Sequence, residues 1–191
     1  MSSLAPTLQA FFTYRLAQQR QASAHTVAAY RDTFRQLFAF VHQLSGRAPS
    51  QLAIEDLDAP VIGAFLENLE RGRGNSVRTR NARLAAVRSF FHFAAFRHPE
   101  QAALIQRVLA IPQKRFTRAV VSFLTAVEID ALLAAPDRSI WIGRRDRTLL
   151  LMAVQTGLRV AELTGLTCQD VELGSGAHVR CHGKGRKDRC T

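Results

Sequence analysis

The chain has 191 residues, 47% of them apolar and 21% charged, which is the composition of a globular protein long enough to bury a core. Lysine and arginine number 26 against 15 acidic residues, so the net charge of +11 indicates a polyanionic partner such as nucleic acid or an anionic membrane surface. No apolar run approaches the roughly 20 residues that span a bilayer, and no secretory signal is recognisable, so we expect a cytoplasmic protein without a membrane segment.

Helical periodicity governs the first part of the chain. Asp58 is placed to cap the third helix, and Gly46 is placed to end the second. These patterns predict an all-helical bundle over residues 1–110. The expected helices cover residues 8–16, 27–44, 60–70, 77–94 and about 101–109.

Proline and paired cations replace the apolar periodicity over residues 111–123, which predicts a basic linker. We expect a second unit over residues 124–191. It begins with helices, of which the longest is expected at about 139–156, with Trp141 on its buried side and Gly157 as its end.

The pattern changes to short strands near the end of the chain. Strands are predicted at residues 171–173 and 178–181, and a turn at 183–185 leads into the start of another strand. The expected fold is therefore mainly α with a small antiparallel β portion.

Cysteine usage indicates a reducing compartment. Cys168, Cys181 and Cys190 are odd in number and lack C-x-x-C spacing. A zinc site formed by His178, Cys181, His182 and Cys190 is the alternative, but residues so close in sequence alternate across a strand pair. We expect no metal and no other cofactor.

Arginine dominates the cations between residues 71 and 99, where no acidic residue occurs. This segregation predicts a positive face that binds duplex DNA with steep salt dependence, and the alternative is an ordinary solvated helix surface. Arg80 and Arg88 project toward the apolar arc of their helix, so they either flank the core or reach the DNA. The predicted DNA-binding residues are Thr26, Arg31, Arg71, Arg73, Arg78, Arg80, Arg83, Arg88, Lys114, Arg115 and Arg118.

The most informative motif is T-G-L-R-x-x-E-L, which contains Arg159 and Glu162. A glycine ends one helix, the arginine opens the next, and the glutamate lies one turn further on. Such an arginine is a rigid cation that can bind a phosphate at two points, although an ordinary ion pair within a helix is the alternative. A second motif, G-K-G-R-K-D-R, places Lys184 at the tip of the predicted hairpin.

These two motifs, in this order and after a basic helical unit, resemble the tyrosine recombinase family, also called phage-type integrases. The resemblance implies a SAM-like core-binding domain that clamps DNA, followed by the front part of a catalytic domain. In that family a tyrosine attacks a DNA phosphate without a metal. The resemblance implies that Arg159 stabilises charge on this phosphate, that Glu162 orients Arg159, and that Lys184 protonates the leaving oxygen.

Two family features are absent from these 191 residues. No histidine is followed at the third place by arginine, so the H-x-x-R motif is missing. The only tyrosines are Tyr14 and Tyr30, on apolar helix faces where we expect core or near-core positions. Without a nucleophile the covalent step has no starting point. We therefore expect a truncated recombinase that retains DNA binding and does not cleave DNA alone.

The expected partners are duplex DNA and, on that DNA, other recombinase subunits, with no membrane and no small-molecule substrate. Two other functions fit the sequence. The first alternative is a non-enzymatic DNA-binding regulator of full-length recombinases. The second is a general basic protein that binds RNA or membrane surfaces. Competition between duplex DNA, RNA and anionic vesicles distinguishes these functions.

Overall fold

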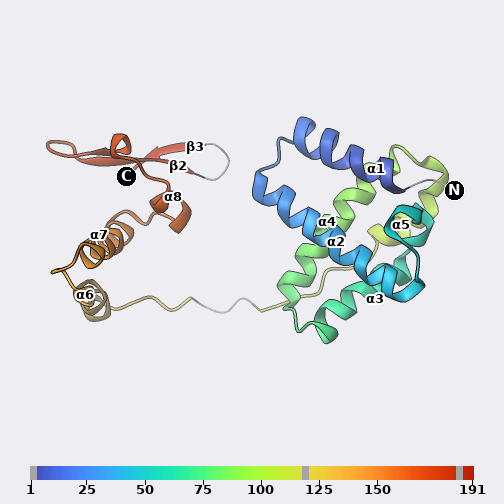
Figure 1. Cartoon of the computed structure of the whole chain (residues 1–191), viewed down its shortest axis with the longest axis horizontal. Helices are drawn as coiled ribbons and strands as arrows, with labels where there is room; N and C mark the ends of the chain where they lie inside the picture. The colour runs from blue at the N-terminus through green and yellow to red at the C-terminus, as the bar shows by residue number, and fades with distance from the viewer. Residues whose placement is uncertain (1–3, 118–120, 184–186) are drawn as a thin grey trace. The chain divides into compact units, whose positions relative to one another are not determined.

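The computed structural model describes residues 4–117, 121–183 and 187–191, which form two compact units that divide after residue 118 (Figure 1). The expected fold class is confirmed, because most of the described chain is helical and one three-stranded antiparallel sheet lies in the second unit. Among the described residues, no helix is both long and apolar enough to cross a membrane.

The first unit is helical, and its helices lie close to the ranges predicted from the sequence. Its α-helices are α1 (Leu4–Ala10), α2 (Ala24–Ser45), α3 (Ala59–Glu67), α4 (Val77–Ala95) and α5 (Ala102–Leu109). Two π-helical segments, η1 (Phe11–Gln19) and η4 (Asn68–Gly72), continue α1 and α3. Short 3-10 turns occur at η2 (Pro49–Gln51), η3 (Ile54–Asp56) and η5 (Pro99–Gln101).

Local hydrogen bonds explain where these helices begin and end. The Asp58 carboxylate accepts a hydrogen bond from the backbone N–H of Val61 at 2.9 Å, as the sequence predicts for an N-cap. Ser76 caps α4 in the same way. Gly46 adopts a left-handed conformation with φ of +70° and ends α2, which confirms the predicted glycine C-cap.

Aromatic side chains form the centre of the first unit. Phe11, Phe34 and Phe90 come from η1, α2 and α4 and are completely or almost completely buried. The ring centroids of Phe34 and Phe90 are 5.3 Å apart, and those of Phe11 and Phe90 are 5.6 Å apart, both in edge-to-face geometry. The expectation that Tyr14 is a core or near-core residue is wrong, because it is 49% exposed, whereas Tyr30 packs half-buried against the core.

The second unit is smaller and places its helices before its sheet. Thr125 and Glu128 form a reciprocal capping box at the start of its first helix. The helices are α6 (Ala126–Ala134), α7 (Trp141–Thr156), α8 (Val160–Thr164) and the 3-10 turn η6 (Cys168–Asp170). The strands are β1 (Val171–Glu172), β2 (His178–Gly183) and β3 (Lys187–Cys190).

β2 is the central strand and pairs in antiparallel fashion with β1 and β3. A small core of Leu158, Val179 and Cys181 lies between the sheet and the region around α8. The prediction that Trp141 contributes to a buried side of α7 is wrong, because Trp141 is 65% exposed. Sequence periodicity identified the apolar residues of α7, but the described part of this unit supplies little surface to cover them.

Candidate functional site

The arginines of α4 differ in where their guanidinium groups point, and Arg80 points inward. Arg80 is 7% exposed, and its Nη1 donates hydrogen bonds to the Pro112 carbonyl and to Oδ1 of Asn81, both at 3.1 Å. Arg88 similarly donates from Nη2 to the carbonyl oxygen of Leu109 at 2.7 Å. A buried guanidinium bonded to main-chain carbonyls is not available to an external phosphate. Of the two positions that the sequence left open for Arg80, the structure shows the one that flanks the core.

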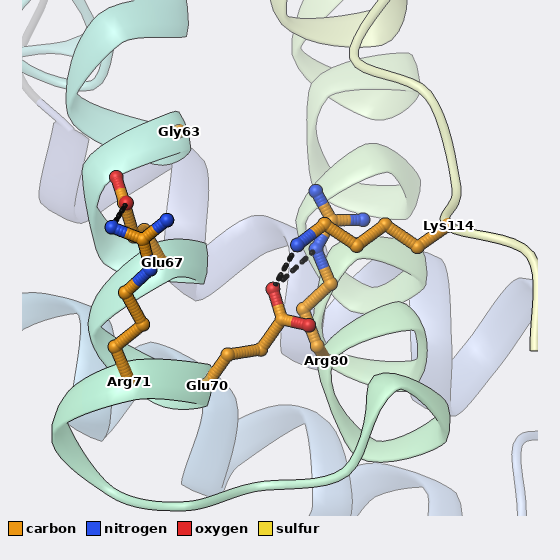
Figure 2. A pocket seen from close by; sticks show the side chains of 6 residues that line it. All are labelled: Gly63, Glu67, Glu70, Arg71, Arg80 and Lys114. Atoms are coloured by element: carbon orange, nitrogen blue, oxygen red, sulfur yellow. Dashed lines mark hydrogen bonds and ion pairs between the residues drawn. The ribbon is translucent and has the colours of Figure 1, made fainter.

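Figure 2 shows how Lys114 is held beside Arg80. The Glu70 carboxylate lies between them, with Oε2 2.6 Å from Nζ of Lys114 and 3.8 Å from Nε of Arg80. Asn81 binds the main chain of Lys114 in both directions, since its Nδ2 donates to the carbonyl at 2.7 Å and its Oδ1 accepts from the backbone N–H at 3.1 Å. Glu70 therefore balances the charge of Lys114, and the first residues of the segment expected to be a linker are fixed to the first unit.

Arg83 joins α4 to α2. Its Nη1 donates to the carbonyl oxygen of Ala29 at 3.1 Å and to Oγ1 of Thr33 at 3.0 Å, and its Nη2 pairs with Asp32. Hydrogen bonds from Arg35 and then from Arg83 lower the pKa of the Asp32 carboxyl, while burial opposes this shift. This network fixes the crossing of the two helices, so a structural role now accounts for Arg83.

The remaining predicted cations of the first unit stay at its surface, and we call them the outward set. Arg31 in α2 and Arg78 in α4 are exposed and form no ion pair with any described residue. Arg71 pairs with Glu67 at 2.7 Å, and Arg73 donates to Gln36 at 2.8 Å, yet both arginines remain exposed. The outward set comprises Arg31, Arg71, Arg73, Arg78 and Arg115.

Two other predicted DNA-binding residues stand apart from the outward set. Thr26 is half-buried in the cap of α2, where its backbone N–H donates to the Ser23 hydroxyl at 3.3 Å. Arg118 lies outside the described residues.

In the second unit, Arg159 is the N-cap residue of α8 and follows Gly157, whose φ of +62° ends α7. Glu162 accepts two hydrogen bonds from Arg159, one at Oε2 from the backbone N–H and one at Oε1 from Nη1, both at 2.8 Å. The side chain of Glu162 is 5% exposed, whereas that of Arg159 is 66% exposed. A buried carboxylate thus holds an exposed guanidinium, whose other N–H groups have no partner among the residues that the structure describes and can bind an anion.

A second arginine, which the sequence analysis missed, reaches the same carboxylate. Arg189 in β3 donates from Nη2 to Oε2 of Glu162 at 3.0 Å and from Nε to Sγ of Cys181 at 3.3 Å. The register of the hairpin sets Arg189 opposite Cys181. The strand pairing was predicted, but the contact with α8 depends on how the sheet packs, and no local pattern reveals it.

The contact between Glu162 and Arg189 favours the charged form of both side chains. The pKa of the Glu162 carboxyl is lowered, first by the backbone hydrogen bond from Arg159 and then by the Arg159 side chain and the charge of Arg189, while burial opposes the shift. The hydrogen bond to Cys181 and the attraction of Glu162 raise the pKa of Arg189. Glu162 is therefore ionised at neutral pH and paired with two cations.

Lys184, the third residue of the predicted catalytic set, lies outside the described residues, and its role stays a prediction. Among the histidine, cysteine, aspartate and glutamate residues that the structure describes, no three lie together in a way that could hold a metal ion.

Known proteins with related sequences and folds identify the class. Residues 8–98 match the family model described as phage integrase, N-terminal SAM-like domain, and residues 122–191 match that described as phage integrase family. The fold is similar to that of the XerH site-specific recombinase, solved in a post-cleavage complex with palindromic difH substrate, with a TM-score of 0.60 and 21% identity. That likeness covers 90% of this chain and 49% of XerH, and it shows that the two chains share a fold over this length. The chain belongs to the phage integrase, or tyrosine recombinase, family.

Curated relatives agree with this assignment. The chain is 62% identical to "Putative integrase/recombinase y4rC" of Sinorhizobium fredii (strain NBRC 101917 / NGR234) over 100% of its own length and 57% of that protein. It is 35% identical to the tyrosine recombinase XerC of Rhodospirillum centenum over 91% of its length and 50% of XerC. The chain therefore spans about half the length of these relatives.

Proposed function

We propose that this chain binds duplex DNA as part of a protein of site-specific recombination, with other recombinase subunits as further partners on that DNA. The observation that carries the proposal is the exposed guanidinium of Arg159 on the buried carboxylate of Glu162, because such a fixed, charged fork binds a phosphate at two points. Family membership supports DNA as the partner, since XerH was solved with its difH substrate.

The chemistry proposed for the second unit follows from this geometry and from the family resemblance. Arg159 stabilises the negative charge that develops on a phosphate as its oxygens are exchanged, and Glu162 keeps the guanidinium aimed. Lys184 supplies the proton for the leaving oxygen. Arg159 and Glu162 are preorganised in the free protein, so little free energy is needed to orient them when a phosphate arrives.

The outward set is the DNA-binding surface that we propose for the first unit. Arginines exposed on helices contact phosphates without reading bases, so this surface positions the protein and contributes affinity for any duplex. Arg31 and Arg78 are the strongest members on the helices, because their side chains form no ion pair or hydrogen bond with a described residue, whereas Arg71 pairs with Glu67. Arg80, Arg83 and Lys114 contribute by holding the helices and the start of the linker in place.

Measurement of binding to labelled duplex DNA across a range of salt concentrations tests the proposal. We expect the logarithm of the binding constant to fall linearly with the logarithm of salt concentration, because each neutralised phosphate releases counterions. Duplex DNA should compete better than single-stranded RNA or anionic vesicles. A salt slope near zero, or equal binding to all three competitors, contradicts the proposal.

We further propose that these 191 residues do not cleave DNA by themselves. The family nucleophile is a tyrosine, and the chain's tyrosines are Tyr30, which stacks at 6.3 Å on Phe11 in the first unit, and Tyr14. Neither follows an H-x-x-R motif, which the sequence lacks. Residues 119–191, which carry Arg159, contain no tyrosine, so that segment supplies no nucleophile of the family's kind.

Incubation with a nicked duplex that traps covalent intermediates tests this second proposal. We expect no protein–DNA adduct on a denaturing gel, within the sensitivity set by a dilution series of a cross-linked standard. Because Tyr14 is half-exposed, the Tyr14→Phe variant is the control. An adduct in the unmodified chain would overturn the proposal, and its loss in the Tyr14→Phe variant would identify the nucleophile.

A further inference from the structure

The carboxylate of Glu162 accepts more hydrogen bonds than one ion pair with Arg159 would supply. Its Oε1 accepts one hydrogen bond, from the Arg159 side chain, and its Oε2 accepts two, from the Arg159 backbone and from Arg189. The last of these crosses from β3 to α8 and joins two residues that are 27 positions apart in sequence. The carboxylate that orients Arg159 is therefore fixed partly by the hairpin.

We propose that Arg189 is a positioning residue for Arg159, which acts by locking the shared carboxylate of Glu162. The inference rests on the proposed function, in which Arg159 binds a DNA phosphate. Arg189 does not need to contact that phosphate, since its Nη2 is bonded to Glu162 and its Nε to Cys181.

The geometry explains why one arginine affects the other. Cys181 is buried and is paired with Arg189 across β2 and β3, so the Arg189 side chain is anchored at its Nε before it reaches Glu162. A carboxylate with donors on both oxygens from two directions has one favoured rotation of its last torsion. Without Arg189, Oε2 keeps only the backbone donor of Arg159, and both the carboxylate and the Arg159 guanidinium gain rotational freedom.

A double-mutant cycle on duplex binding tests this dependence. We expect Arg189→Gln to weaken binding by about three- to tenfold in the unmodified chain, the size of one lost hydrogen bond. In the Arg159→Ala background, the same substitution should change affinity by less than about twofold. Arg180→Gln removes an equal charge from the neighbouring strand β2 and should have the same effect in both backgrounds.

Side-chain NMR of arginine in the DNA-free protein supplies a readout that does not depend on DNA. Hydrogen-bonded guanidinium groups rotate slowly and give separate Nη–H signals, so Arg159 should show them in the unmodified chain. In Arg189→Gln these signals should merge while the backbone amide signals of β2 persist, which separates lost positioning from unfolding. Glu162→Gln removes the shared charge and should have the same effect on Arg159.

The outcomes separate this inference from the proposed function. An equal loss of affinity on Arg189→Gln in both backgrounds means that Arg189 acts independently of Arg159 and overturns the inference. Unchanged Arg159 signals in Arg189→Gln also overturn it, and Glu162→Gln is the control that shows how far the signals merge when the shared carboxylate is lost. If the unmodified chain fails to bind duplex DNA, the proposed function fails. The NMR measurement then still decides whether Arg189 positions Arg159.

Discussion

Replacing Arg31 and Arg78 together with alanine is expected to weaken duplex binding by about 100-fold at low salt, because each charge–phosphate hydrogen bond contributes roughly 1.5 kcal/mol or more. The slope of the salt dependence should decrease by about two, since two fewer phosphates are neutralised. The loss should be similar for duplexes of unrelated sequence, because phosphate contacts carry no base information. Fluorescence anisotropy with two such duplexes measures both quantities.

A matched control uses two other exposed arginines, Arg97 and Arg107, which lie after α4 and in α5. The Arg97→Ala/Arg107→Ala variant loses the same net charge, so it corrects for the general effect of charge on association. We expect the affinity of this control for duplex DNA to change by less than about threefold, because salt screens charges that do not contact the DNA. Equal losses in the two double variants would refute the outward set as a defined surface and leave only a diffuse effect of net charge.

Phe90→Ala is expected to lower the unfolding free energy of the first unit by about 3–5 kcal/mol, the usual cost of truncating a fully buried phenylalanine. Phe90 has no exposed surface and contacts Phe11, Phe34 and Phe91 with ring centroids 5.3–5.6 Å apart. The substitution leaves a cavity among rigid rings that have few alternative rotamers to fill it. Chemical denaturation followed by circular dichroism provides the measurement.

Phe96→Ala is the control for this prediction, because the same residue type lies one residue beyond α4 and is 88% exposed. Its removal should change stability by less than about 0.5 kcal/mol. Similar effects of the two substitutions would contradict the assignment of the aromatic cluster as the core. DNA binding by Phe90→Ala should fail at the denaturant concentration where the first unit unfolds, since α2 and α4 carry Arg31 and Arg78.

The sequence predicted those features that depend on neighbouring residues. Asp58 and Gly46 delimit helices through contacts within one helical turn, and the Arg159–Glu162 pair likewise spans three residues, so local spacing was sufficient. The sequence also revealed the arginine-rich stretch, but it did not settle which of these arginines lie inside the first unit and which lie at its surface. Helical periodicity placed Arg80 toward the apolar arc of its helix without deciding its role, and the packing of residues 112–114 against α4 makes it internal, whereas Arg31 stays exposed.

The errors have a common physical origin in non-local packing. Tyr14 and Trp141 have helical spacing appropriate to a buried face, yet burial requires a partner surface that periodicity does not describe. Arg189 was overlooked for the converse reason, because its partner Glu162 lies in another element. Strand register places Arg189 beside Cys181, but the position of the sheet against α8 decides whether it reaches the carboxylate.

The two-way hydrogen bonding between Asn81 and the main chain of Lys114 has a thermodynamic consequence. Fixing the backbone of one residue costs about 1–2 kcal/mol in conformational entropy. Because Asn81 and Arg80 hold Lys114 and Pro112 in the DNA-free protein, that entropy is lost during folding and does not have to be lost again when DNA binds. Arg115 therefore begins its approach to a phosphate from a peptide unit that is already ordered, which makes its contribution to affinity larger than that of an arginine on a free tether.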